Sequence, residues 1–213
     1  MTAFAGYKGA VYITSSPSLS FTNLAMTDAG DHQNYTITLA TRRYWDNTGG
    51  AFVIQNSPDG TTGWATVSPS TYTIQYVGGK VVFNAPLVNT FVRANAGFYF
   101  PYSQLGDGQN WELGLDLNVV DVTTFGSAWK LNFPLLRGAA AKFGKLYNDG
   151  TFLGLLNALM VVVLFVDGTS APAGPRYEGY AYIKQDQIKS DVKAVIMEDV
   201  SFAVVDKVFY LAN

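Results

Sequence analysis

One stretch near the middle of the chain decides the fold: Trp111–Val119, with the sequence WELGLDLNV. Its residues alternate without a break between apolar side chains and polar or small ones, which is the pattern of a β-strand with one buried face. The apolar face carries Trp111, Leu113, Leu115, Leu117 and Val119, and the other face carries Glu112, Gly114, Asp116 and Asn118. The stretch therefore predicts a long strand with one wet, acidic face.

The same alternation recurs elsewhere in the chain, whereas the 3.6-residue period of an amphipathic helix is almost absent. Shorter examples are Val11–Thr14, Tyr35–Ala40 and Tyr72–Val77. The pair Gly78-Gly79 separates the last of these from Lys80–Phe83 and predicts a hairpin, because glycine takes the positive φ angles of a tight turn. These patterns indicate a β-dominated fold.

The most apolar run, Phe152–Val166, is shorter than the roughly 20 apolar residues that a membrane-spanning helix needs, so no span is expected. We interpret it as a short helix over about Thr151–Ala158 that leads into a buried strand over Leu159–Val166. The β-branched cluster Val161–Val163 favours the strand. The expected fold is therefore mainly β, with one short flanking α-helix.

Composition favours a single domain. The chain has 213 residues, of which 48% are hydrophobic, so it can bury a substantial core without disulfides or metals. Only 14% are charged, against roughly 25% in an average soluble domain, and such an exterior suits burial against partners. We expect one domain over 1–213, with its core mostly in 103–213 and room for an N-terminal β-rich elaboration within about 1–102.

Charge and cysteine content exclude several functions. The 14 basic and 16 acidic residues give a formal charge of -2, which supplies no basic footprint for gripping nucleic acid. The chain has no cysteine, which rules out thiol chemistry, disulfides and cysteine-ligated zinc. Met1–Tyr12 has neither the apolar stretch nor the cleavage pattern of a secretory signal, so we expect maturation in a cytoplasm.

Patterns typical of enzymes are missing from the sequence. His32 is the sole histidine, and with Asp28 and Asp31 it lacks the third ligand of a metal site. A polar loop between two strands, with Gly30 in it, is the better interpretation. Neither a nucleophile elbow, a phosphate loop, a dinucleotide fingerprint nor a calcium loop is present. We expect a protein that is not an enzyme and that uses no cofactor or metal.

The charges of the second half fall into two adjacent blocks of opposite sign. Residues 103–128 carry acids alone, and residues 129–148 carry bases alone. The acids are Asp107, Glu112, Asp116 and Asp121, and the bases are Lys130, Arg137, Lys142 and Lys145. Two interpretations remain open: the strands pair within one subunit and the charges lie across from each other, or the blocks attract identical neighbouring subunits.

In the order and spacing of its motifs, the second half resembles the major tail tube proteins of long-tailed bacteriophages. That family has a tryptophan-led alternating strand that reaches an Asp-Val-Thr-Thr-Phe-Gly-Ser turn, as Trp111–Ser127 does here. A short helix before a buried strand matches Thr151–Val166, and a strand that begins with Glu-Gly before a terminal pair matches Glu178–Asn213. The resemblance covers Tyr102–Asn213 well and is weaker in the earlier part of the chain.

This resemblance implies a twisted β-sandwich or barrel-like tail-tube fold with one flanking helix. Subunits of this kind form hexameric rings that stack into a hollow tube, and the inner sheet of each subunit contributes to one large β-barrel. Double-stranded DNA passes transiently through the tube at ejection. The implied partners are copies of the chain itself and other tail proteins, and the implied location is the virion, with assembly in the host cytoplasm.

Two sets of residues are candidates for these roles. A wall along which DNA slides should be acidic or neutral, because each phosphate neutralised by a basic group strengthens binding. We therefore predict that the lumen is lined by the polar face with Glu112, Asp116 and Asn118, joined by Glu198. For contacts between subunits we predict the turn that follows the long strand, since its aromatic residues would be costly to leave wet. These residues are Thr123, Thr124, Phe125, Trp129 and Lys130. Packing within the core of one subunit is the alternative for these residues.

A different class of protein shares this composition, namely a monomeric carbohydrate- or protein-binding β-sandwich module. Such a module is also rich in aromatic residues and free of catalytic ones, and its exposed Tyr and Trp rings stack on sugars. It would stay monomeric with a localised aromatic patch, whereas a tube subunit buries a large perimeter against copies of itself.

Overall fold

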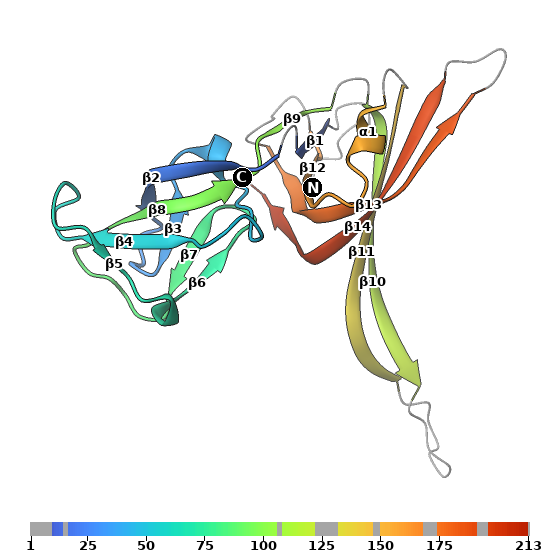
Figure 1. Cartoon of the computed structure of the whole chain (residues 1–213). Coiled ribbons are helices and arrows are strands. Elements are labelled where there is room, and N and C mark those ends of the chain that lie inside the picture. Colours follow the sequence, from blue (N-terminus) through green and yellow to red (C-terminus); the bar gives the residue numbers. More distant parts are fainter. Residues whose placement is uncertain are drawn as a thin grey trace, which may run out of the picture. The chain divides into compact units, whose positions relative to one another are not determined.

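The structure is a computed structural model, and it describes residues 10–14, 17–105, 108–121, 132–146, 150–167, 174–190 and 196–212. The chain divides into two compact units (Figure 1). Unit 1 consists of residues 1–12 and 104–213, and unit 2 consists of residues 13–103.

The fold is mainly β, as predicted, and the described residues contain one short α-helix. Seven strands form the sheet of unit 1, in the order β10-β11-β14-β13-β12-β1-β9. Their bounds are β1 Ala10–Thr14, β9 Tyr102–Gln104, β10 Gly108–Asp121, β11 Asn132–Leu146, β12 Met160–Phe165, β13 Arg176–Lys189 and β14 Met197–Leu211. This sheet curls into a half-barrel (Figure 1).

The longest strands of unit 1 form two antiparallel hairpins. Strand β10 contains the whole alternating stretch Trp111–Val119 and pairs with β11, while β13 pairs with β14. Strand β14 also pairs with β11, which joins the two hairpins into one sheet. In Figure 1 the hairpins extend toward opposite ends of unit 1.

The core of unit 1 lies between the sheet and helix α1, Thr151–Gly154. All six residues of β12 are buried, which confirms the buried strand expected from the valine cluster. Phe152 of α1 is fully buried and its ring centre lies 5.3 Å from that of Phe143 on β11. The helix is shorter than predicted, because the chain leaves helical geometry after Gly154 and Asn157 takes a positive φ of 65°.

Unit 2 is a second β unit, with the sheet order β5-β4-β8-β2-β3-β7-β6. Its strands are β2 Leu19–Asp28, β3 Asn34–Ile37, β4 Val53–Ser57, β5 Ala65–Thr66, β6 Tyr72–Gln75, β7 Lys80–Phe83 and β8 Phe91–Tyr99, with 3-10 turns η2 Ala40–Arg42 and η3 Pro69–Thr71. Its core is aromatic, and Trp45 at its centre is fully buried, with ring centres 5.9 Å from Phe21 and 5.1 Å from Phe52.

Two local predictions for unit 2 are confirmed and one is corrected. Strands β6 and β7 form the predicted hairpin, with Gly78 and Gly79 at φ values of 95° and 60°. His32 lies in the polar loop between β2 and β3, where its Nδ1 is 2.6 Å from Oδ2 of Asp28. The strand expected over Tyr35–Ala40 ends at Ile37, because the chain turns into the 3-10 helix η2.

Candidate assembly surface

Four strands of unit 1, β10, β11, β14 and β13, form a sheet with one open face. The register places Glu112 opposite Lys142, Lys142 opposite Ser201, and Ser201 opposite Gln185. Cross-strand partners share a face, so these four polar residues form one row across all four strands. The face is hollowed by a concavity of about 670 Å³.

The opposite face of the same sheet is covered. Phe143 on β11 and Val200 and Phe202 on β14 are buried there, and the Phe143 and Phe202 rings stack with centres 5.2 Å apart. Phe152 of α1 packs against this side. Because one face is filled by the core, the polar face is the one left for solvent or for a lumen.

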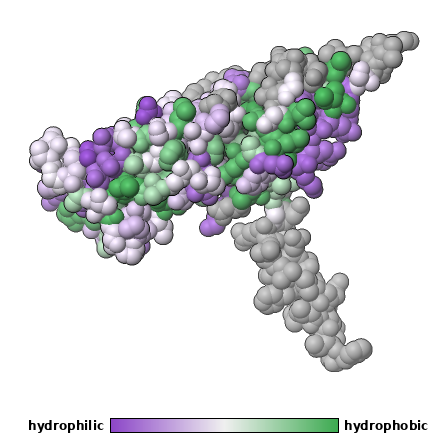
Figure 2. All heavy atoms as spheres, viewed as in Figure 1, coloured by the Kyte–Doolittle hydropathy of each residue, from purple (hydrophilic) through white to green (hydrophobic). Residues whose placement is uncertain are grey.

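The open face carries charges of both signs. Its concavity is lined by the carboxylates of Glu112 and Asp199 and by the ammonium groups of Lys142, Lys184 and Lys189. Asp199 and Lys189 form an ion pair, and both side chains are about half exposed, so the pair contributes little to stability. Figure 2 shows hydrophilic side chains gathered over the outer parts of β13 and β14. The described charges are mixed and nearly balanced, where the sequence predicted an acidic or neutral wall.

The predicted lumen residues separate in the structure. Glu112 is exposed on the open face. The side chains of Asp116 and Asn118 lie outside the described part of the structure. Glu198 differs from the expectation: it is fully buried, because alternation along β14 places it on the opposite face from its neighbour Asp199.

The predicted contact residues Thr123, Thr124, Phe125, Trp129 and Lys130 lie outside the described residues. The structure does bear on the two charge blocks that flank them. Strands β10 and β11 pair within one chain, and Glu112 of the acidic block stands directly opposite Lys142 of the basic block. This register favours pairing within the subunit for these two charges.

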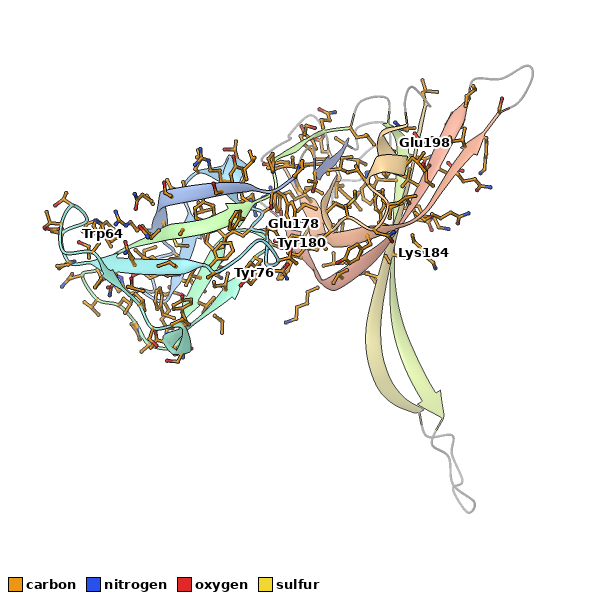
Figure 3. The ribbon with its side chains drawn as sticks, in the orientation of Figure 1. Trp64, Tyr76, Glu178, Tyr180, Lys184 and Glu198 are labelled. Atoms are coloured by element: carbon orange, nitrogen blue, oxygen red, sulfur yellow. The ribbon has the colours of Figure 1, made fainter. Side chains whose placement is uncertain are left out.

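Glu198 belongs to a buried ionic cluster that the sequence did not predict. Oε2 of Glu198 lies 3.0 Å from Nζ of Lys145, and the two side chains are 0% and 3% exposed. The ammonium group also lies 4.8 Å from the centre of the Phe152 ring. The pKa of Glu198 lies above its usual value, chiefly because the carboxyl group is buried. Lys145 lowers this pKa by hydrogen bonding and attraction, and Asp186 raises it. The cluster joins β11, β13 and β14 beneath the open face (Figure 3 labels Glu198).

Both sides of the four-stranded sheet end in an unpaired edge among the described residues. Strand β10 has β11 on one side and is the terminal strand of the sheet order. Strand β12 pairs with β13 over Arg176–Ala181, so the rest of β13, Tyr182–Lys189, has β14 alone as a neighbour. Such edges present free backbone N–H and C=O groups and act as templates for another chain.

The apolar face of β10 continues beyond the core. Leu113 lines a small apolar pocket together with Val162 and Leu164 of β12. Leu115, two residues further along the same face, is 64% exposed. Leu113 and Leu115 form a short apolar row on a long edge strand, and its outer member is exposed, which favours association.

Among the described residues there is no group of three or more His, Asp or Glu side chains that could hold a metal ion. In the same part of the chain, no helix is both long and apolar enough to cross a membrane.

Comparison with known proteins finds likenesses in structure. No protein-family model matches the chain, and no curated protein matches it. A chain from the virion of a native gene transfer agent particle is similar, with 11% identity and a TM-score of 0.43, over 52% of this chain and 89% of that one. A chain from the tail of an empty particle of this kind, refined with six-fold symmetry, has 12% identity and a TM-score of 0.42, over 53% and 87%. A chain from the six-fold symmetrised baseplate of the anti-feeding prophage has 8% identity and a TM-score of 0.39, over 78% and 96%.

Proposed function

We propose that this chain is a structural subunit of a phage tail tube, which polymerises with its copies into stacked hexameric rings around a channel for DNA. The observation that carries the proposal is the four-stranded sheet β10-β11-β14-β13, which has a polar face, a covered face and an open edge on each side. Among the described residues both of these edges lack a partner strand, and a neighbouring copy supplies it.

The strand directions fit a closed ring. Each of the four strands is antiparallel to the next, so β10 and β13 run in opposite directions. When β10 of one copy lies beside the Tyr182–Lys189 edge of the next, the new pair is antiparallel as well. The contact is head-to-tail, and repeating it by rotation closes a ring in which neither of these two edges remains exposed. The hexameric count comes from the resemblance to tail tube proteins.

The channel wall follows from the same geometry. With the core and α1 outside, the face with Glu112, Lys142 and Ser201 lines the lumen. Three lysines line the concavity of this face. Two of them have a carboxylate beside them, since Lys142 stands opposite Glu112 and Lys189 is paired with Asp199. A wall with compensated cations offers few sites at which a phosphate can displace a counterion and bind, which suits the sliding of DNA.

Assembly is tested by placing a charge on the apolar row of β10. The wild-type chain is expected to form rings or hollow tubes in negative-stain electron microscopy and to sediment as large particles. Leu115→Glu should lower the mass of the sedimenting particles at least about tenfold, toward the mass of the monomer. The reason is that the new carboxylate would be buried in the contact between β10 and the neighbouring copy. Val88→Glu is the matched control, since Val88 is also 64% exposed but lies in unit 2. A wild-type chain that stays monomeric at all concentrations would contradict the proposal and favour a monomeric binding module.

The lumen assignment is tested by charge reversal. Virions that carry Glu112→Lys together with Asp116→Lys should assemble normally but eject DNA several-fold more slowly, because the added cations bind phosphates. Rings are counted by electron microscopy and ejection is timed by DNA release. The control Thr22→Lys adds a cation at an exposed position of unit 2. Ejection at the wild-type rate by the double variant would show that this face does not line the channel.

A further inference from the structure

Unit 2 carries an exposed aromatic and cationic surface on the outer face of its sheet. On β8, Phe91 and Arg93 alternate with the buried residues Val92 and Ala94, so the first two lie on the same outer face. Two residues along a strand span about 7 Å. Phe91 is 57% exposed although it lies within a paired strand.

The loop between β4 and β5 supports this surface from below. Gly60, at φ +73°, lies under the Phe91 ring so closely that a Cβ there would be 2.9 Å from its Cγ. The Asp59 carboxylate accepts hydrogen bonds from the backbone N–H groups of Thr61 and Thr62, at 2.8 and 2.7 Å. The Ser57 hydroxyl donates to the same carboxylate at 2.9 Å. These bonds hold the loop in one shape, so the aromatic groups that it supports are positioned before any ligand arrives.

The guanidinium of Arg93 lies over the ring of Trp64, which belongs to the same loop (Figure 3 labels Trp64). The guanidinium carbon is 4.0 Å from the ring centre. Nε and Nη2 of Arg93 donate to Oε1 of Gln55, at 2.9 and 2.7 Å. Gln55 is neutral, so these bonds orient the guanidinium without cancelling its charge. The result is an oriented cation over the Trp64 ring, two residues along β8 from Phe91.

We propose that Trp64, Phe91 and Arg93 form a binding platform for an acidic sugar, such as the uronate units of a surface polysaccharide. Sugar C–H groups are weakly positive and pack on the negative faces of aromatic rings. A planar guanidinium recognises a carboxylate through paired, charge-assisted hydrogen bonds. Apolar surface with a few oriented polar groups is the usual composition of a small-molecule site. This inference does not depend on the proposed tube function, since all of its residues belong to unit 2.

The platform is tested by calorimetric titration of the full chain with soluble oligogalacturonate and with its methyl ester, which has the same rings without the negative charge. We expect the wild type to bind the free acid and to bind the ester at least about tenfold more weakly. Trp64→Ala and Phe91→Ala should each weaken binding of the acid by about tenfold or more. Arg93→Gln should make the affinities for acid and ester nearly equal. Val88→Ala, an exposed substitution in the same unit, should change neither affinity.

A wild-type chain that binds neither ligand at millimolar sugar would overturn the platform, and so would binding that survives both aromatic substitutions. Equal affinity for acid and ester in the wild type would overturn the role of Arg93. Far-ultraviolet circular dichroism and the melting temperature of each variant verify that the surface substitutions leave the fold intact. Failure here leaves the assembly experiment unaffected, because that experiment concerns strand β10.

Discussion

Lys145→Met is expected to lower the free energy of unfolding of unit 1 by up to about 3 kcal/mol at pH 7, because the buried carboxylate loses its cation and must take up a proton to stay buried. Glu198 is fully buried, and Nζ of Lys145 is its partner at 3.0 Å. Methionine preserves most of the volume of the lysine stem and the packing against Phe152, so the loss reports mainly on charge. Urea unfolding followed by circular dichroism measures it.

The pH dependence separates this explanation from a packing defect. The folded-state pKa of Glu198 is raised, so its contribution to stability is present below the unfolded value of 4.5 and is lost as the pH rises through the folded value. Without Lys145 the folded-state pKa of Glu198 rises further, so stability continues to fall up to a higher pH than in the wild type. The difference in unfolding free energy between the wild type and Lys145→Met should therefore be small near pH 4 and largest near pH 8.

A double variant provides the control for this experiment. Lys145→Met with Glu198→Gln removes both charges, and it should recover most of the stability that the single variant loses. Its unfolding free energy also supplies the pH baseline, since Glu198 no longer titrates. A single variant that is equally destabilised at pH 4 and pH 8 would show that packing, rather than the buried charge, sets the loss.

Trp45→Ala should lower the free energy of unfolding of unit 2 by about 3–5 kcal/mol, because it leaves a cavity at the centre of an aromatic core. The side chain is fully buried and packs against Phe21 and Phe52. The backbone N–H of Trp45 still donates to the carbonyl of Tyr76 after the substitution, so the change is confined to the side chain. Chemical unfolding monitored by the fluorescence of the remaining tryptophans measures the loss.

Trp64→Ala removes the same side chain from a surface position and serves as the matched control. Trp64 is partly exposed and its described partner is the guanidinium of Arg93, so the expected cost is no more than about 1 kcal/mol. If the two substitutions destabilise the protein equally, the core of unit 2 is not centred on Trp45.

The strands were the most predictable part of this protein. Alternation along Trp111–Val119 and the Gly78-Gly79 turn are local signals, and the structure contains the strand and the hairpin that they indicate. The helix was predicted too long, because the positive φ at Asn157 depends on how the chain turns back toward β12. The chain passes from one compact unit to the other between residues 12 and 13 and between residues 103 and 104, and the second of these points lies next to the boundary at 102/103 expected for the N-terminal elaboration.

The candidate site was only partly predictable. Glu112 lies on the open face because two-residue alternation assigns a side chain to a face without any knowledge of the neighbours. Glu198 was assigned to the same face, but which face of β14 is buried depends on its register with β11. Lys145 and Glu198 are 53 positions apart in the chain, so no local pattern could have paired them.

The sequence by itself determined the mainly β class, the long amphipathic strand, the strong hairpin and the low surface charge, because these follow from local periodicity, turn chemistry and composition. Tertiary structure alone decided the pairing of Glu112 with Lys142, the burial of Glu198, the open edge of β13 beyond Ala181 and the stacking of Arg93 on Trp64. Each of these depends on strand register and strand order, which arise from contacts between residues far apart in the chain and which a period of two leaves undetermined.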